Sequence, residues 1–179
     1  MHIYTFHKFH SILILPINNL KDSYNRLTDL IPIEWQIILM SDGSFTQNLN
    51  SLTGKCTKIK IFQKYNDILI NQIKNIRVVW LKNDKFDQLT FARSLWRYTC
   101  TDSITLKLSK QKAVGQSIIE SKIDIYKDIH EIYYGYCIYL EKKFNSKKPI
   151  WGRKYTLYYN HQSYAVIQEF FSPNLINFF

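Results

Sequence analysis

The chain has 179 residues, of which 46% are hydrophobic and 16% aromatic, and it contains only five glycines and four prolines. This length and composition predict one compact domain with a sizeable core, which excludes an intrinsically disordered protein and leaves no room for a second domain. The formal net charge of +10 is compatible with nucleic acid, a membrane surface or a small anion as partner. Because the basic residues are scattered, we favour a solvated basic surface and expect no nucleic-acid partner.

The N-terminal segment does not read as a membrane anchor. The apolar run at residues 12–17 is too short to span a membrane, and no small-residue cleavage site of a secretory signal follows it. We interpret residues 1–20 as an extension or an edge element and residues 21–179 as the single domain. The three cysteines are far apart and lack a CxxC pattern, so we expect reduced thiols and neither a disulfide nor a metal site.

Two short helices are predicted next along the chain. Pro32, followed by apolar residues at helical spacing, indicates the start of the first helix. Asp42 and Ser44 are good N-cap residues for the second helix, and Gly54 is a typical stop signal. The two helices therefore meet at residues 42–44, where backbone N–H groups at a helix start can bind an anion.

The rest of the chain reads mainly as β-strands. The alternation changes phase near His130, which predicts a bend or bulge. Residues 160–162 read as a short hairpin connection, and residues 102–108 and 115–120 as short helices. Short connections without long crossover helices predict an α+β fold, a single antiparallel sheet of about six strands with helices on one side. The predicted strands are residues 55–63, 75–82, 89–98, 123–139, 155–159 and 164–171.

Four charged residues alternate in step with apolar residues along these strands. They are Arg77, Arg93, Arg153 and Glu169, and the period of two predicts that all four side chains point into an apolar layer. An unpaired buried charge costs several kcal/mol, so three arginines against one glutamate suggest an anionic ligand. Two structural alternatives stay open. Arg77 can form an ion pair with Glu169, and Arg93 or Arg153 can be a buried arginine bound to backbone carbonyls.

Six short motifs occur in an order that resembles the chorismate lyase family, in particular its cyanobacterial and plastid-encoded branch. The resemblance covers roughly residues 30–175, and it departs from the family at Ala113 and Val114, where a proline and a leucine are usual. The motifs are DGSFT at residues 42–46, Arg77 in RVVWL, FARS at 91–94, Val114 with Gly115, WGR at 151–153 and EFFSP at 169–173.

The resemblance implies an enzyme that converts chorismate to 4-hydroxybenzoate and pyruvate without metal or organic cofactor. It implies that Arg77 holds the ring carboxylate, with backbone N–H groups of Phe45 and Val114, and that Glu169 meets the ring hydroxyl. Residues 42–46 and 113–115, including Gly115, would be helical flaps over an enclosed pocket. For the second carboxylate of chorismate, Arg153 is the first choice and Arg93 the next.

The resemblance also bears on the setting of the protein. Lysine, isoleucine, asparagine, tyrosine and phenylalanine are abundant, a bias typical of a very AT-rich genome, so we expect an organelle-encoded protein of the plastid stroma. We expect a monomer whose partner is the small molecule chorismate. The competing interpretation is a non-catalytic sensor of aromatic acids with the same fold, although such modules normally follow a DNA-binding winged helix.

Overall fold

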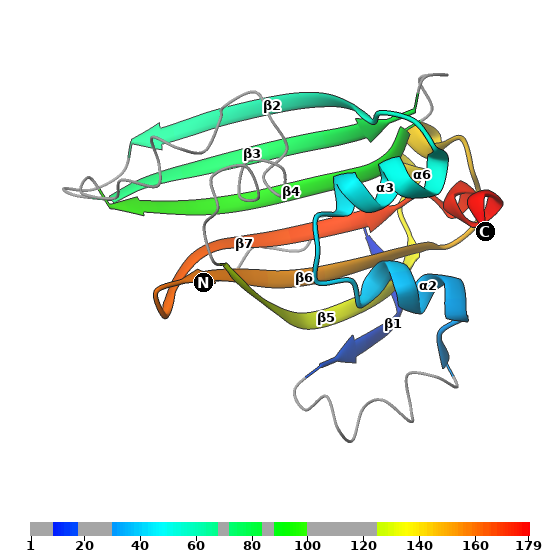
Figure 1. The fold of residues 1–179 in the computed structure, drawn as a ribbon, viewed down its shortest axis with the longest axis horizontal. Coiled ribbons are helices and arrows are strands. Elements are labelled where there is room, and N and C mark those ends of the chain that lie inside the picture. The colour runs from blue at the N-terminus through cyan, green and yellow to red at the C-terminus, as the bar shows by residue number, and fades with distance from the viewer. Residues whose placement is uncertain (1–8, 18–29, 68–71, 84–87, 100–124) are drawn as a thin grey trace.

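The computed structural model describes residues 9–17, 30–67, 72–83, 88–99 and 125–179, and these form one sheet with short helices (Figure 1). The sheet is antiparallel, with seven strands in the order β1-β5-β6-β7-β4-β3-β2. The strands are β1 (His10–Pro16), β2 (Lys58–Asp67), β3 (Gln72–Lys82), β4 (Gln88–Thr99), β5 (Tyr126–Tyr136), β6 (Ile150–Tyr159) and β7 (Gln162–Phe171). The helices are α2 (Ile33–Leu39), α3 (Phe45–Thr53), α6 (Ile138–Phe144) and the 3-10 helix η1 (Pro173–Phe178).

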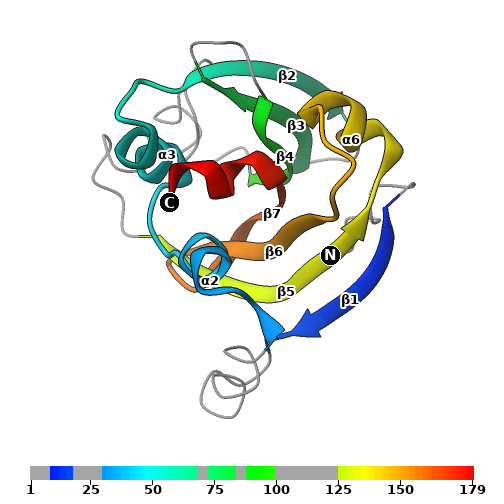
Figure 2. The ribbon, with the colours of Figure 1, turned by 90° about the vertical axis from the view of Figure 1, so that its right-hand side faces the viewer.

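The antiparallel sheet with few short helices confirms the α+β class, with seven strands where about six were predicted. The additional strand, β1, lies at the edge of the sheet and pairs with β5. Viewed end-on, the sheet curves from β2 at one edge to β1 at the other (Figure 2). No helix in the described part of the chain is long and apolar enough to span a membrane.

The two faces of the sheet carry separate cores. On one face, which we call the α2–α3 face, Trp35 and Leu49 pack with buried strand residues such as Phe171. On the other, the α6 face, Leu140 and Phe144 pack with residues of β3, β4 and β7. The prediction of helices on one side only is therefore wrong, because α6 covers the second face.

The β5 strand is shorter than predicted. It ends at Tyr136, and α6 begins at Ile138, so the end of the predicted strand 123–139 is helical. The helix forms because Leu140 and Phe144, one turn apart, are buried together. The predicted bulge is confirmed, since the pairing of β5 with β6 shifts register at His130.

The ends of α2 and α3 lie at residues that commonly begin or end helices. Pro32 is the N-cap residue of α2, and Ser44 is the extended N-cap residue of α3. Gly54 ends α3 in the left-handed conformation with a φ of 63°, as expected for a glycine stop. Residues 40–44 therefore form a short link between two helices on the same face of the sheet (Figure 1).

The β6–β7 hairpin sets the pairing on which the site depends. It turns at Asn160 and His161, whose φ angles of 46° and 61° suit a tight hairpin turn, and this confirms the predicted connection. The turn pairs Tyr159 with Gln162, and a register shift between Tyr158 and Leu157 then brings Arg153 on β6 directly opposite Glu169 on β7.

Candidate functional site

Three of the four predicted inward charges share the α2–α3 face. In the register of the sheet, Arg153 lies opposite Glu169, and Glu169 lies opposite Ala92. Ala92 in turn lies opposite Val79, which is two residues from Arg77 on β3. Paired residues on adjacent strands point to the same face, so the side chains of Arg77, Arg153 and Glu169 do so as well. All three are buried, with exposed fractions of 5%, 0% and 7% respectively. The prediction that these three charges point inward is confirmed.

Arg93 is not part of this cluster. It pairs with Val78 and Gln168, which places it half-buried on the α6 face. Arg93 does share a face with Phe91, as the alternation predicts, but Phe91 belongs to the core of the α6 face. Because both faces of the sheet are apolar, alternation alone could not show which face Arg93 occupies.

Glu169 forms its ion pair with Arg153, and the alternative of a pair with Arg77 is wrong. The Nε atom of Arg153 donates to Oε2 of Glu169 at 2.8 Å, with both side chains buried. The register explains this choice, because Arg153 lies directly opposite Glu169 whereas β4 separates β3 from β7.

Arg153 also binds the end of α2. Its Nη1 atom donates to the carbonyl oxygens of Ile38, Leu39 and Ser41 at 3.1, 2.9 and 2.9 Å. The last carbonyls of a helix lack partners within the helix, so the guanidinium supplies donors that they need. Arg153 therefore has the structural role that the sequence left open, and it fixes the α2–α3 connection to the sheet.

Aromatic side chains surround this ion pair. The hydroxyl of Tyr155 donates to Oε1 of Glu169 at 3.1 Å, so each carboxylate oxygen accepts a hydrogen bond. Burial, followed by the negative charge of Glu169, raises the pKa of Tyr155 well above its ordinary value, so this phenol stays protonated. The guanidinium carbon of Arg153 lies 5.3 Å from the ring centre of Tyr155, 5.6 Å from that of Phe171 and 5.9 Å from that of Phe45.

Of the two predicted flaps, residues 42–46 can be placed and residues 113–115 cannot. Phe45 is the first residue of α3, and its ring packs against Phe171 with centroids 4.8 Å apart. Val114 and Gly115 lie outside the described residues, as do the predicted helices 102–108 and 115–120. The enclosed pocket under two flaps therefore remains a prediction.

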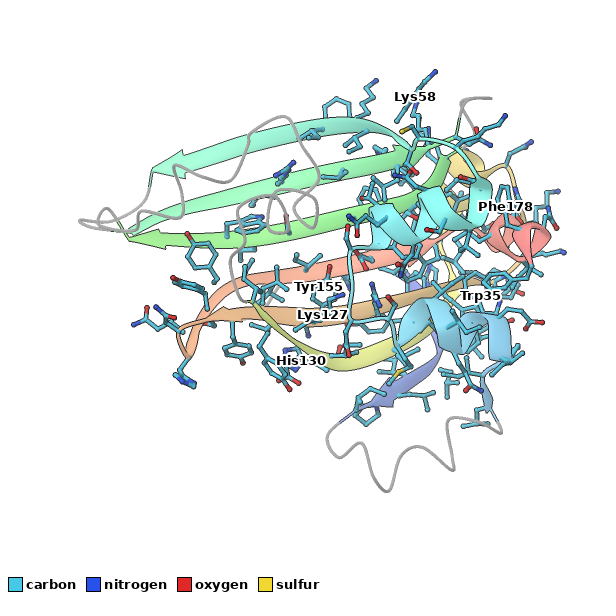
Figure 3. All side chains as sticks on the ribbon, in the orientation of Figure 1. Trp35, Lys58, Lys127, His130, Tyr155 and Phe178 are labelled. Atoms are coloured by element: carbon cyan, nitrogen blue, oxygen red, sulfur yellow. The ribbon has the colours of Figure 1, made fainter. Side chains whose placement is uncertain are left out.

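Lys127 is a member of the cluster that sequence reasoning missed. It lies on β5 opposite Leu157, on the α2–α3 face, and its Nζ atom is 5.0 Å from the ring centre of Tyr155 (Figure 3). The Nζ atom donates to the carbonyl oxygens of Ser41 and Gly43 at 3.1 and 3.0 Å. A signal was present, because the alternation of Lys127 with the buried Ile129 predicts an inward position.

The surroundings of Lys127 weaken its charged form. Burial, followed by the positive charge of Arg153, lowers the pKa of Lys127 from 10.5 to about 8, although Glu169 and Asp42 act in the opposite direction. A cavity of about 140 Å³ adjoins this lysine. It is lined by Ile17, Met40, Asp42, Tyr126, Lys127, Asp128 and Ile129.

Gly152 allows the close approach of β6 and β7 beside the ion pair. A Cβ atom at this position would lie 2.7 Å from the carbonyl oxygen of Glu169 and 2.8 Å from the Phe170 ring. The glycine of the WGR motif is thus required by packing. Within the described ranges, no three His, Cys, Asp or Glu side chains are grouped so that they could hold a metal ion.

Comparisons with known proteins relate this arrangement to one family. Residues 39–179 match the family described as chorismate pyruvate-lyase Rv2949c-like. The chain is 48% identical over 165 residues to the uncharacterized protein ycf21 of Antithamnion sp., covering 92% of each chain. It is 41% identical over 152 residues to that of Porphyra purpurea, covering 83% of this chain and 86% of the relative. It is 31% identical over 155 residues to that of Cyanophora paradoxa, covering 80% and 79% respectively.

Proposed function

Because this chain belongs to the chorismate pyruvate-lyase Rv2949c-like family, we propose that it eliminates pyruvate from chorismate and leaves 4-hydroxybenzoate. One observation carries the proposal. A buried glutamate is held by Arg153 and Tyr155 on a sheet face that also carries the buried Arg77. A positively charged, water-poor face with one fixed carboxylate suits a dianionic substrate that must be held in a single pose.

In this proposal, Arg77 grips the ring carboxylate of chorismate. A guanidinium presents a rigid pair of N–H groups that matches a carboxylate, which an ammonium group cannot reproduce. By family resemblance, the backbone N–H groups of Phe45 and Val114 assist, and Gly115 belongs to the same substrate-binding segment as Val114. Arg93 has no part in this scheme, since it lies on the α6 face.

Arg153 acts chiefly by orienting Glu169. Its Nε atom is bound to Glu169, and its Nη1 atom is bound to three carbonyls. Its Nη2 atom has no hydrogen-bond partner among the described residues. Because Nε and Nη1 are engaged and Nη2 is buried, Arg153 cannot present a free fork of two nitrogens to a substrate carboxylate, which weakens its assignment as the main partner of the second carboxylate.

We assign Glu169 to the ring hydroxyl and the neighbouring ether oxygen. In the reaction the ether C–O bond breaks, the ring loses a proton from the adjacent carbon, and the departing enolpyruvate gains a proton to become pyruvate. Formation of the aromatic ring supplies the driving force, so the protein needs to fix the reactive pose and stabilise charge on the leaving oxygen. The scheme requires neither a metal nor an organic cofactor.

The decisive test is incubation of the purified protein with chorismate, followed by chromatography of the products. We expect 4-hydroxybenzoate and pyruvate in equal amounts, at a rate that excess chelator does not change. Isochorismate, prephenate or salicylate as product would contradict the proposal. Tight binding of 4-hydroxybenzoate without any turnover would instead favour the non-catalytic sensor.

Substitution Arg77→Lys is expected to weaken binding of 4-hydroxybenzoate by about 2 to 3 kcal/mol, the scale of a charge-assisted hydrogen bond. Lysine keeps the charge but loses the fork. Calorimetric titration of the folded variant measures the effect. Arg93→Lys is the matched control, because Arg93 lies on the opposite face and its replacement should leave binding unchanged. Wild-type affinity in the Arg77 variant would make this arginine structural.

The setting proposed for this activity is the plastid stroma, with the protein encoded by the organelle and acting as a monomer. The amino-acid bias toward AT-rich codons and the ycf21 relatives in Antithamnion sp., Porphyra purpurea and Cyanophora paradoxa support this location.

A further inference from the structure

Lys127 places a second positive charge beside the Arg153–Glu169 pair. Its two hydrogen bonds go to neutral carbonyl oxygens, and no carboxylate of the described residues forms an ion pair with it. An ammonium group has three N–H donors, so one donor remains after these two bonds. The face of Tyr155 lies beside the Nζ atom, at 5.0 Å from the ring centre.

We propose, on the basis of the function proposed above, that Lys127 binds the second carboxylate of the substrate, the one on the enolpyruvyl side chain. In this way Lys127 makes the site selective for a dianion over a monoanionic aromatic acid. The substrate class is a benzoate-like ring that carries an ether-linked carboxylate. Arg153 is less suited to this role, because it is fully buried, its Nε and Nη1 atoms are engaged, and only its buried Nη2 atom is left without a partner among the described residues.

The order of residues across the sheet fits this assignment. On β6, Tyr155 lies between Arg153, which is opposite Glu169, and Leu157, which is opposite Lys127. In the substrate, the ether oxygen lies between the ring and the second carboxylate. A carboxylate at Lys127 would therefore leave the ether oxygen near Tyr155 and Glu169, which hydrogen-bond to each other at 3.1 Å.

Arg77 lies far enough away to hold the opposite end of the same molecule. Strands β4, β7 and β6 separate β3, which carries Arg77, from β5, which carries Lys127. At the usual spacing of strands, the backbones of β3 and β5 are ~19 Å apart. Both side chains are long and lie on the same face of the sheet. The cavity that adjoins Lys127 lies on the side of Met40 and Asp42.

The test uses two stable probes that differ only in the second carboxylate. The dianion is 3-(carboxymethoxy)-4-hydroxybenzoate, and the monoanion is 4-hydroxy-3-methoxybenzoate. In Lys127→Met the dissociation constant of the dianion should rise about 10- to 100-fold, as for loss of one charge-assisted hydrogen bond, while that of the monoanion changes less than about twofold. Lys60→Met, at an exposed position on the edge strand β2, is the control with the same change of charge, and it should alter neither constant.

A second measurement needs no variant and covers the case in which Lys127→Met fails to fold. The charged groups that act on Lys127 are Arg153, Glu169 and Asp42, and together with burial they set its pKa at about 8. Lys127 is charged below that pH and neutral above it. Wild-type preference for the dianion should therefore fall as the pH is raised from 7 to 10. Both probes carry the same phenol, so its ionisation cancels in the ratio of the two constants.

The outcomes separate this assignment from the proposed function. Equal weakening of both probes in Lys127→Met would overturn the assignment, because Lys127 would then act only by holding residues 41–43. Unchanged binding of both probes, or a wild-type preference that does not vary with pH, would overturn it as well. In each of these results the wild-type protein still binds aromatic acids, so the proposed function stands. If neither probe bound the wild-type protein, the proposed function and this assignment would fall together.

Discussion

Glu169→Gln is expected to lower kcat for chorismate by ~10²-fold or more, a typical contribution of a group that takes part in proton transfer. Glutamine keeps the shape of the side chain, and its amide oxygen can still accept the hydrogen bond from Arg153 while its NH2 group donates to the hydroxyl oxygen of Tyr155; these two residues hold Glu169 at 2.8 and 3.1 Å. It lacks the charge and the acidity that the reaction requires at the ring hydroxyl. The loss should therefore appear in turnover more than in the binding of 4-hydroxybenzoate.

The same substitution has a structural consequence that must be measured separately. Removal of the carboxylate leaves the fully buried Arg153 without its counter-charge, so the thermal midpoint should also fall. Turnover and midpoint are measured on one preparation, well below the midpoint. Tyr155→Phe is the matched control, because it removes one hydrogen bond to Glu169 but keeps the charge. Near-normal turnover with a markedly lower midpoint in Glu169→Gln would overturn the catalytic role.

The strand pattern could be predicted because alternation with a period of two is a local signal. It correctly placed Arg77, Arg153 and Glu169 inside and located the bulge at His130. It failed at the start of α6, because the apolar residues 138–140 continue the apolar pattern of β5 and are compatible with either a strand or a helix. The helix is selected by packing on the second face of the sheet, a tertiary effect that the local sequence does not express.

Which residues contact one another in the site depends on the strand order and register, and neither could be predicted from the sequence. The partner of Glu169 is decided by which strands are neighbours, and the order β6-β7-β4-β3 selects Arg153 over Arg77. Lys127 was overlooked because a lysine on a strand usually marks a solvent-exposed position. Its side chain instead reaches the carbonyl groups of the α2–α3 connection, which is distant in sequence.

Arg153→Met is expected to lower the free energy of unfolding by about 3 to 5 kcal/mol, the usual cost of breaking a buried ion pair by removal of one partner. Methionine fills a similar volume but leaves Glu169 charged and buried, at an exposed fraction of 7%. It also removes the donor that binds the carbonyls of Ile38, Leu39 and Ser41 at the end of α2. Urea unfolding followed by tryptophan fluorescence measures the change, with 4-hydroxybenzoate absent.

Two further variants decide what the loss in Arg153→Met means. Arg93→Met removes a half-buried arginine from the opposite face and should cost about 1 kcal/mol or less. The double variant Arg153→Met/Glu169→Gln should be more stable than the sum of the two single effects predicts, because it leaves no unpaired buried charge. Strictly additive effects would show that Arg153 stabilises the fold through the α2 carbonyls alone. In that case the ion pair serves to orient Glu169 and adds nothing to the stability of the fold.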